Sequence, residues 1–247
     1  MISKKVLSEI VSKYSLGGHV EKVKWIVNEN DSIIIKFIND SKTLVGEINY
    51  KNSIGLKKGD YGIFNTSQLI KCLNILDGDI LIDTKSQNGL VSKLNLADTN
   101  YDIKFSLADP AIIPKVPEVT EGDQPSASFE ISDEFITRFV KSKDALNDLL
   151  SFTVETGEGM TGDELIFTIG SDITNTIQFK VDERHTINEE FKQIPFDSDL
   201  FKEILKSNRS YESGMVHINK KGLIQLQFNY NDGFNTNYYL VRLQENN

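Results

Sequence analysis

"ISKKVLSEIV" at positions 2–11 returns in modified form as "ISDEFITRFV" at positions 131–140. In the first stretch apolar residues recur at i, i+1, i+4 and i+5 from Val6, which is the spacing of one buried stripe on a helix. Ser3 stands at the N-cap position, and Ser132 is its counterpart in the second stretch. The sequence therefore predicts the same amphipathic helix in each half of the chain.

The repeat extends beyond these helices. "SIIIKFI" (32–38) is echoed by "ELIFTIG" (164–170), and "TLVGEINY" (43–50) by "NTIQFKVD" (175–182). Their alternation and β-branched residues are typical of antiparallel strands. A second helix, "SQLIKCLNIL" (67–76), is echoed by "SDLFKEILKS" (198–207), and further strands close each half. We expect an α+β fold of two repeated domains, each with two helices packed on antiparallel sheets.

A proline-rich segment separates the two halves of the chain. "ADPAIIPKVPEVTEGDQP" (108–125) holds four of the five prolines, which disfavour helix and remove strand donors. The predicted organisation is a first domain at 1–107, a linker at 108–125 and a second domain at 126–247. Apolar residues within the linker indicate that it lies against a surface.

Composition and charge limit the classes of protein to which this chain can belong. Hydrophobic residues make up 39% and charged residues 26% of the 247, as in ordinary globular proteins, and no apolar run is long enough to cross a membrane. The start lacks signal-peptide features, and the lone Cys72 rules out an internal disulfide, so a cytoplasmic location is expected. Each predicted helix is net positive although the chain carries −9, which favours contact between the helices and a polyanion.

Motifs for catalysis and cofactors are weak. "GEGMTG" (157–162) satisfies the glycine pattern of a dinucleotide site, but a strand-like segment follows it and acidic residues crowd the loop, so a plain hairpin connection is expected. Cys72 has no predicted histidine partner, and the histidines and carboxylates do not show metal-ligand spacing. The prediction is a protein without enzymatic activity, cofactor or metal.

"LNLADTNYDIKFSLADP" (94–110), running into the proline-rich linker between two helix–strand repeats, resembles the DNA sliding clamps. The similarity is greatest to the clamps of tailed bacteriophages and more distant to proliferating cell nuclear antigen, which implies a viral protein in the host cytoplasm. It implies a clamp fold, a ring of subunits around duplex DNA with the helices lining the hole, and partners comprising a replicative DNA polymerase and a clamp loader. The implied function is that of a processivity factor in DNA replication.

The resemblance also assigns residues. Cations of the helices would face the DNA without reading its sequence: Lys4, Lys5, Lys13, Lys71, Arg138, Lys141, Lys202, Lys206 and Arg209. The last strand of the first domain would pair antiparallel with a strand of the neighbouring chain, through Tyr101, Ile103, Phe105 and Leu107 against Asn175, Ile177, Phe179 and Val181. A partner peptide would dock in an apolar crevice formed by Ile112, Ile113, Val116, Tyr238, Leu240 and Leu243.

Ring size follows from helix packing. Helices side by side lie ~9 Å apart, so twelve helices from three chains make a circle roughly 35 Å across, with roughly 25 Å clear after subtracting a helix diameter of about 10 Å. Eight helices from two chains leave only ~13 Å by the same estimate. Since duplex DNA is roughly 20 Å wide with grooves ~8 Å deep, the prediction is a homotrimer.

The sequence also allows a second function. A β-rich structural or virion assembly protein built from a duplicated domain would show the same repeat of elements. Such a protein has no reason to concentrate cations on its helices, and that charge distribution is the feature that favours the clamp.

Overall fold

The computed structural model describes residues 2–87, 90–119, 124–159, 162–171 and 173–244. The chain divides into two compact units, the first comprising Met1–Pro117 with Asn231–Thr236 and the second Glu118–Tyr230 with Asn237–Asn247. Residues 108–117, the first part of the predicted linker, thus belong to the first unit. The boundaries 1–107, 108–125 and 126–247 stay a prediction.

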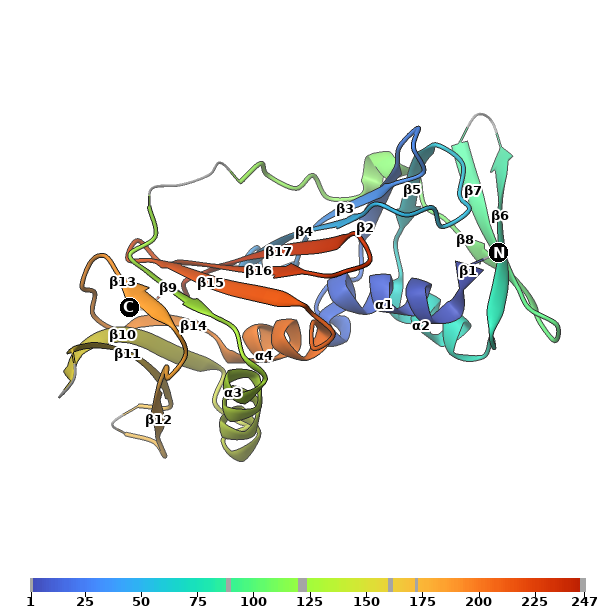
Figure 1. Cartoon of the computed structure of the whole chain (residues 1–247). Coiled ribbons are helices and arrows are strands. Elements are labelled where there is room, and N and C mark those ends of the chain that lie inside the picture. Colours follow the sequence, from blue (N-terminus) through green and yellow to red (C-terminus); the bar gives the residue numbers. More distant parts are fainter. Residues whose placement is uncertain (1, 88–89, 120–123, 160–161, 172, 245–247) are drawn as a thin grey trace. The chain divides into compact units, whose positions relative to one another are not determined.

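In its described residues the first unit combines two α-helices and two short 3₁₀ helices, η1 and η2, with two sets of strands; Figure 1 shows their arrangement. In chain order its elements are β1 (Ile2–Ser3), α1 (Lys4–Ser15), η1 (Leu16–Gly18), β2 (Val23–Val27), β3 (Ile33–Ile38), β4 (Leu44–Tyr50), β5 (Gly59–Ile63), α2 (Thr66–Asn74), β6 (Asp79–Gln87), β7 (Leu90–Ala97), β8 (Asp102–Ser106) and η2 (Pro110–Ile112). One set is ordered β1-β6-β7-β8 and the other β4-β3-β2-β5.

The second unit repeats this plan. Its elements are β9 (Ala127–Glu130), α3 (Asp133–Ala145), β10 (Ser151–Gly159), β11 (Gly162–Ile169), β12 (Ile177–Lys180), β13 (His185–Ile187), β14 (Ile194–Asp197), α4 (Ser198–Ser207), β15 (Ser213–Asn219), β16 (Leu223–Asn229) and the part of β17 (Phe234–Val241) from residue 237 onward. The orders are β9-β15-β16-β17, with β13 added beside β9, and β12-β11-β10-β14. Position by position, these match the two orders of the first unit, so the repeat predicted from sequence is a repeat of sheet topology.

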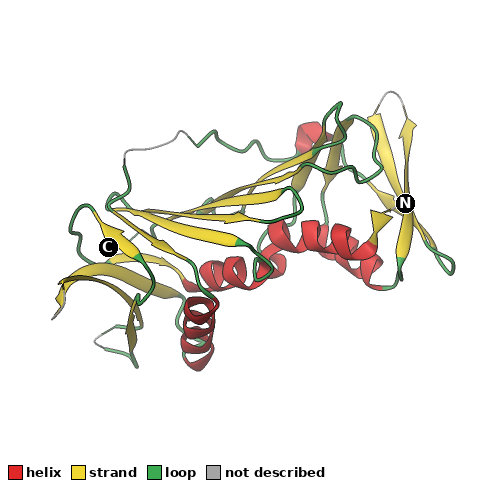
Figure 2. Cartoon of the chain, viewed as in Figure 1, coloured by secondary structure: helices red, strands yellow, loops and turns green. Residues whose placement is uncertain are grey.

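Strand pairing is antiparallel in both units. In the first, Ile35 lies opposite Trp25 on one side and Ile48 on the other; in the second, Phe167 lies opposite Val154 and Phe179. Within each unit the helices, red in Figure 2, lie side by side as the pairs α1–α2 and α3–α4. The predicted α+β architecture is confirmed.

The helices are held by their apolar stripes. In the first unit the buried ring of Tyr14 on α1 packs against Trp25 and Phe37, with ring centroids 6.4 and 6.3 Å apart. Gly46 lies opposite Phe37 in the sheet, where an added Cβ would come within 2.1 Å of the ring. The sheet can therefore accept this large ring only because position 46 has no side chain.

Phenylalanines form the core of the second unit. Phe139 on α3 packs on Phe201 of α4 at 4.6 Å between centroids and on Phe152 of β10 at 5.1 Å. Phe167 of β11 stacks on Phe152 at 5.7 Å. Because this cluster fixes the buried face of both helices, it also fixes which residues are left on their polar faces.

Helix ends follow the expected chemistry only in part. Ser132 caps α3 by accepting a hydrogen bond from Phe135 N at 2.9 Å, and Asn65 caps α2 through Gln68 N at 2.8 Å. Ser3 occupies the N-cap of α1, but its side chain makes no cap bond. Helix α1 ends at Ser15, and the left-handed residue at its C-cap is Leu16, with φ of 46°.

Candidate functional site

The polar helix faces carry four exposed cations that have no ion-pair partner among the described residues. These are Lys5 on α1, Lys71 on α2, Lys141 on α3 and Arg209, two residues beyond α4. Each comes from a different helix region, because the repeat places one polar face on every helix. They are free to attract a polyanion.

Two further predicted cations on α4 are partly neutralised. Lys202 Nζ lies 2.9 Å from Asp144 Oδ1, and Lys206 Nζ lies 2.8 Å from Glu203 Oε1. The hydrogen bond from Lys202 lowers the pKa of Asp144, and the same contact raises the pKa of Lys202. The face of α4 therefore carries less free charge than its lysines indicate.

Lys4 and Arg138 also hold local partners. Lys4 Nζ donates to the carbonyl oxygen of Leu76 and approaches that of Asn74 at 3.5 Å. This places a cation at the C-terminal end of α2, where it is favourable against the helix dipole. Arg138 binds Asp182 at 2.7 Å and the carbonyl oxygen of Lys180 at 2.7 Å, and its guanidinium lies over the Phe179 ring.

Lys13, one of the cations predicted to face DNA, lies in the interior of the fold. Its side chain is completely buried and pairs with Glu9 at 3.0 Å, one turn earlier on α1. Burial lowers the pKa of the ammonium group, and the contact with Glu9 offsets only part of this effect. A buried ammonium cannot reach a phosphate, so the prediction that Lys13 faces DNA is wrong.

The two strands predicted to join neighbouring chains both lie at the edge of a sheet. β8 pairs only with β7, and β12 only with β11, within the described residues. One side of each strand therefore presents backbone N–H and C=O groups that belong to no ladder, which is the requirement for adding a further strand.

Side chains alternate along both edges. On β8 Ile103 is half-buried and Phe105 is buried, while Asp102, Lys104 and Ser106 are exposed. On β12 Ile177 and Phe179 are half-buried, whereas Gln178 and Lys180 are exposed. The flanking predicted residues follow suit: Tyr101 and Asn175 are exposed, Leu107 is half-buried and Val181 is buried. Each edge thus has one apolar and one polar face.

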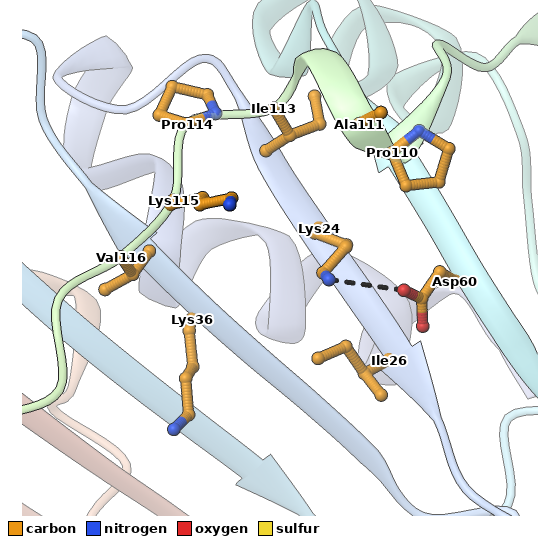
Figure 3. Close-up of a pocket in the computed structure, with 10 residues that line it drawn as sticks. All are labelled: Lys24, Ile26, Lys36, Asp60, Pro110, Ala111, Ile113, Pro114, Lys115 and Val116. Carbon is orange, nitrogen blue, oxygen red and sulfur yellow. Dashed lines mark ion pairs between the residues drawn. The ribbon is translucent and has the colours of Figure 1, made fainter.

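A pocket of about 500 Å³ lies beneath residues 110–116 in the first unit (Figure 3). Ile113 and Val116 of the predicted set line it, together with Ile26 from β2. Lys24, Lys36 and Lys115 surround these apolar groups, with Lys24 paired to Asp60 at 3.2 Å and Lys36 to Glu47 at 3.3 Å. The pocket therefore combines an apolar floor with net positive charge.

Other residues assigned to this crevice lie elsewhere. Tyr238 and Leu240 are fully buried in the second unit, where the Tyr238 hydroxyl contacts Asn208, so their predicted role in peptide docking is wrong. Leu243 lines a separate pocket with Ile194 and Pro195. Ile112 is exposed and lines a groove beside β8.

Sequence reasoning missed the β2 and β3 residues of the pocket. A signal was present: in β2 the buried residues are Val23, Trp25 and Val27, so Lys24 and Ile26 share the opposite face. Alternation identifies that face, but not the segment that covers it, because residues 110–116 are far away in sequence.

The glycine-rich segment lies in a hairpin. β10 and β11 pair antiparallel up to Gly159 and Gly162, which confirms a hairpin at the glycine-rich segment; Met160 and Thr161 within it lie outside the described residues. No group of three or more metal-ligating side chains occurs in the described part of the chain. None of the helices described there has the length and apolar character to span a membrane.

Comparison with known proteins shows the fold. No protein-family model matches the sequence, and no curated protein matches it either. The crystal structure of Proliferating Cellular Nuclear Antigen (PCNA) from Entamoeba histolytica aligns with a TM-score of 0.73 at 16% identity, over 98% of this chain and 96% of that one. The chain has the DNA sliding-clamp fold.

Two further clamp structures align over nearly their whole length. PCNA of A. fulgidus, solved with the C-terminal region of FEN-1 bound, gives a TM-score of 0.73 at 15% identity, over 100% of this chain and 98% of that one. The PCNA2–PCNA3 complex from Sulfolobus tokodaii gives 0.71 at 13%, over 98% and 97%. The predicted closeness to the tailed-phage clamps in particular stays a prediction.

The Asp144–Lys202 contact generates a prediction on proton affinity. In Lys202→Met, the pKa of Asp144 will rise toward its ordinary value of about 3.9, because the ammonium that stabilises its carboxylate is gone. Since the folded-state pKa is depressed, the contact stabilises the fold above about pH 4 and its contribution is lost as pH falls through the lowered pKa. An NMR pH titration of the aspartate side-chain carbons measures the shift.

An internal control lies in the same spectrum. The pKa of Asp98 is lowered by hydrogen bonds from backbone amides, of which that of Asp77 is the strongest, and not by a lysine. The pKa of Asp98 will be the same in Lys202→Met as in the parent protein. An Asp144 pKa unchanged by the substitution would contradict the assignment.

Proposed function

We propose that this protein is a non-enzymatic DNA sliding clamp, three copies of which close a ring around duplex DNA and tether a replicative DNA polymerase. The observation that carries the proposal is the clamp fold, which covers 98–100% of this chain and 96–98% of the two PCNA structures. A loader that opens the ring and a role in DNA replication are part of the same proposal.

Contact with DNA is assigned to the helices. Lys5, Lys71, Lys141 and Arg209 supply charge without ion-pair partners among the described residues, on a chain whose net charge is −9. A polyanion is attracted to the helices and repelled elsewhere. Mobile single cations bind phosphates without reading bases, which suits a protein that moves along DNA.

Ring closure is assigned to the edges of β8 and β12. In antiparallel pairing, Ile103 of one copy lies beside Phe179 of the next and Phe105 beside Ile177, so apolar faces meet. In the same register Asp102 lies opposite Lys180, whose ammonium also pairs with Glu164 of its own chain at 2.6 Å, so the two carboxylates share one cation. A shift by two residues would set Lys104 against Lys180 and is disfavoured by repulsion.

Partner docking is assigned to the pocket beneath residues 110–116. A. fulgidus PCNA was solved with the C-terminal region of another protein, FEN-1, and the PCNA2–PCNA3 complex joins two clamp chains. By analogy, a polymerase peptide would bury apolar side chains against Ile26 and Ile113. Lys115 would favour acidic residues beside its apolar anchors, and Lys36 would add less because it pairs with Glu47 at 3.3 Å.

The first prediction concerns assembly. Light scattering with size-exclusion chromatography will give a mass near three times 27.9 kDa. Asp102→Lys will weaken each interface by up to about fivefold through loss of a cross-strand charge pair of ~0.2–1 kcal/mol, and further through repulsion between the introduced lysine and Lys180. Asp102→Lys combined with Lys180→Asp will restore it. A parent protein that stays monomeric at micromolar concentration, or a double variant weaker than both single variants, would refute this ring.

The second prediction separates two lysines of α1. Lys5→Gln will lower the affinity for a short duplex and reduce the slope of log K against log salt by about 0.9 for each phosphate that the protein no longer neutralises. Lys13→Met removes the same charge at the buried position and will leave both the duplex affinity and the salt slope unchanged. Fluorescence anisotropy across a salt series measures affinity and slope. Equal effects of the two substitutions would contradict the assignment of the helix faces.

The third prediction concerns the pocket. Ile26→Gln will abolish stimulation of the replicative polymerase from the same genome, because it places an amide on the apolar floor, while trimer mass and duplex affinity stay unchanged. Ile82→Gln, which alters a half-buried isoleucine on β6 outside the pocket, is the control and will retain stimulation. Primer extension with and without the protein measures the effect. Full stimulation by Ile26→Gln would exclude this pocket.

A further inference from the structure

A second groove lies beside the free edge of β8. It encloses about 590 Å³ in the first unit and is lined by Phe64, Cys72, Phe105, Leu107 and Ile112 among others. Phe64 and Ile112 are 47% and 60% exposed. Two large apolar side chains left in water around an apolar groove indicate a surface that is covered in the assembled protein.

The most exposed apolar side chain of the described residues lies beside the other edge. Ile173 is 95% exposed and precedes β12 by four residues. A turn holds this segment, because Thr174 N donates to Ser171 O at 3.0 Å and Thr174 Oγ1 accepts from Ser171 N at 2.9 Å. A structured turn that presents an isoleucine to solvent is suited to insertion into a partner.

Antiparallel pairing brings these two features together. When β12 of one copy adds to β8 of the next, the start of β12 lies beside the end of β8. Ile173 lies just before that start, and Leu107 and Ile112 lie just after that end. Ile173 of one copy and the groove residues Leu107 and Ile112 of the next therefore lie beyond the same end of the joined strands.

We infer that Ile173 of one copy inserts into the groove between Phe64 and Ile112 of its neighbour and anchors each subunit contact. The inference rests on the proposed ring, and it adds an apolar anchor to the strand pairing. A second copy is the occupant because the groove is continuous with the β8 edge and the isoleucine with the β12 edge. The pairing of Asp102 with Lys180 supplies charge complementarity in the same register.

Crosslinking tests the anchor directly. Cys72 is the only cysteine of the chain, so Cys72→Ser gives a thiol-free background. In that background, Ile112→Cys with Ile173→Cys will give covalent dimers and trimers on a denaturing gel after treatment with a short bismaleimide. The residues are exposed in the free chain, so neither substitution disturbs the core.

Two matched pairs make the outcomes distinct. Asp102→Cys with Lys180→Cys reports on the strand pairing alone, and Leu81→Cys with Ile173→Cys pairs Ile173 with an exposed leucine on β6 away from the groove. Crosslinks from the 112/173 and 102/180 pairs, but not from the 81/173 pair, support the anchor. Crosslinks from 102/180 without 112/173 overturn the anchor and leave the ring intact.

The remaining outcomes are also decisive. A 112/173 product that stays monomeric on the gel means the two residues meet within one chain, which overturns the anchor. Equal yields from 81/173 and 112/173 mean random collision and overturn it as well. No crosslink from any pair, together with a monomeric mass by light scattering, overturns the ring and the anchor with it.

Ile173→Asp gives an independent readout. Because Ile173 is almost fully exposed, this substitution will leave the unfolding midpoint of the isolated chain unchanged. In the assembled state it would bury a carboxylate among Phe64 and Ile112, so the trimer will dissociate at higher protein concentration than the parent. An unchanged dissociation midpoint would overturn the anchor.

Discussion

The open edges of two strands are the constraint on which the proposed assembly depends. Within the described residues, β8 and β12 each have a strand partner on one side only. Such edges invite uncontrolled strand addition unless they are blocked or paired. Here each strand alternates more buried apolar residues with exposed polar or charged ones, and in the proposed ring this alternation restricts which strands and registers can pair.

The repeat of topology determines where the edges and helices lie. Both units have the same strand orders, and each places two helices side by side. The buried faces differ in detail, with tyrosine and tryptophan in one core and stacked phenylalanines in the other. The polar faces are freed from packing, so cations can occupy them at little cost to the fold.

The order of elements was predictable because it depends on periodicity, and two different periods alternate along each half of the chain. The burial of residues at the boundary of a helix's apolar stripe could not be predicted in this way. Lys5 and Lys13 look alike in sequence, yet Lys13 lies on the edge of the apolar face and pairs with Glu9. Tyr238 and Leu240 alternate like pocket residues, but alternation cannot tell which face of a strand meets the core.

A join between β8 and β12 uses two different surfaces, one from each half of the chain. Such a contact is head-to-tail, so every subunit of a closed ring points the same way around it. The assembly then has a front and a back. In the proposed ring all pockets beneath residues 110–116 would open with the same sense relative to the ring axis, so proteins docked there would share one orientation with respect to the strand polarity of the duplex.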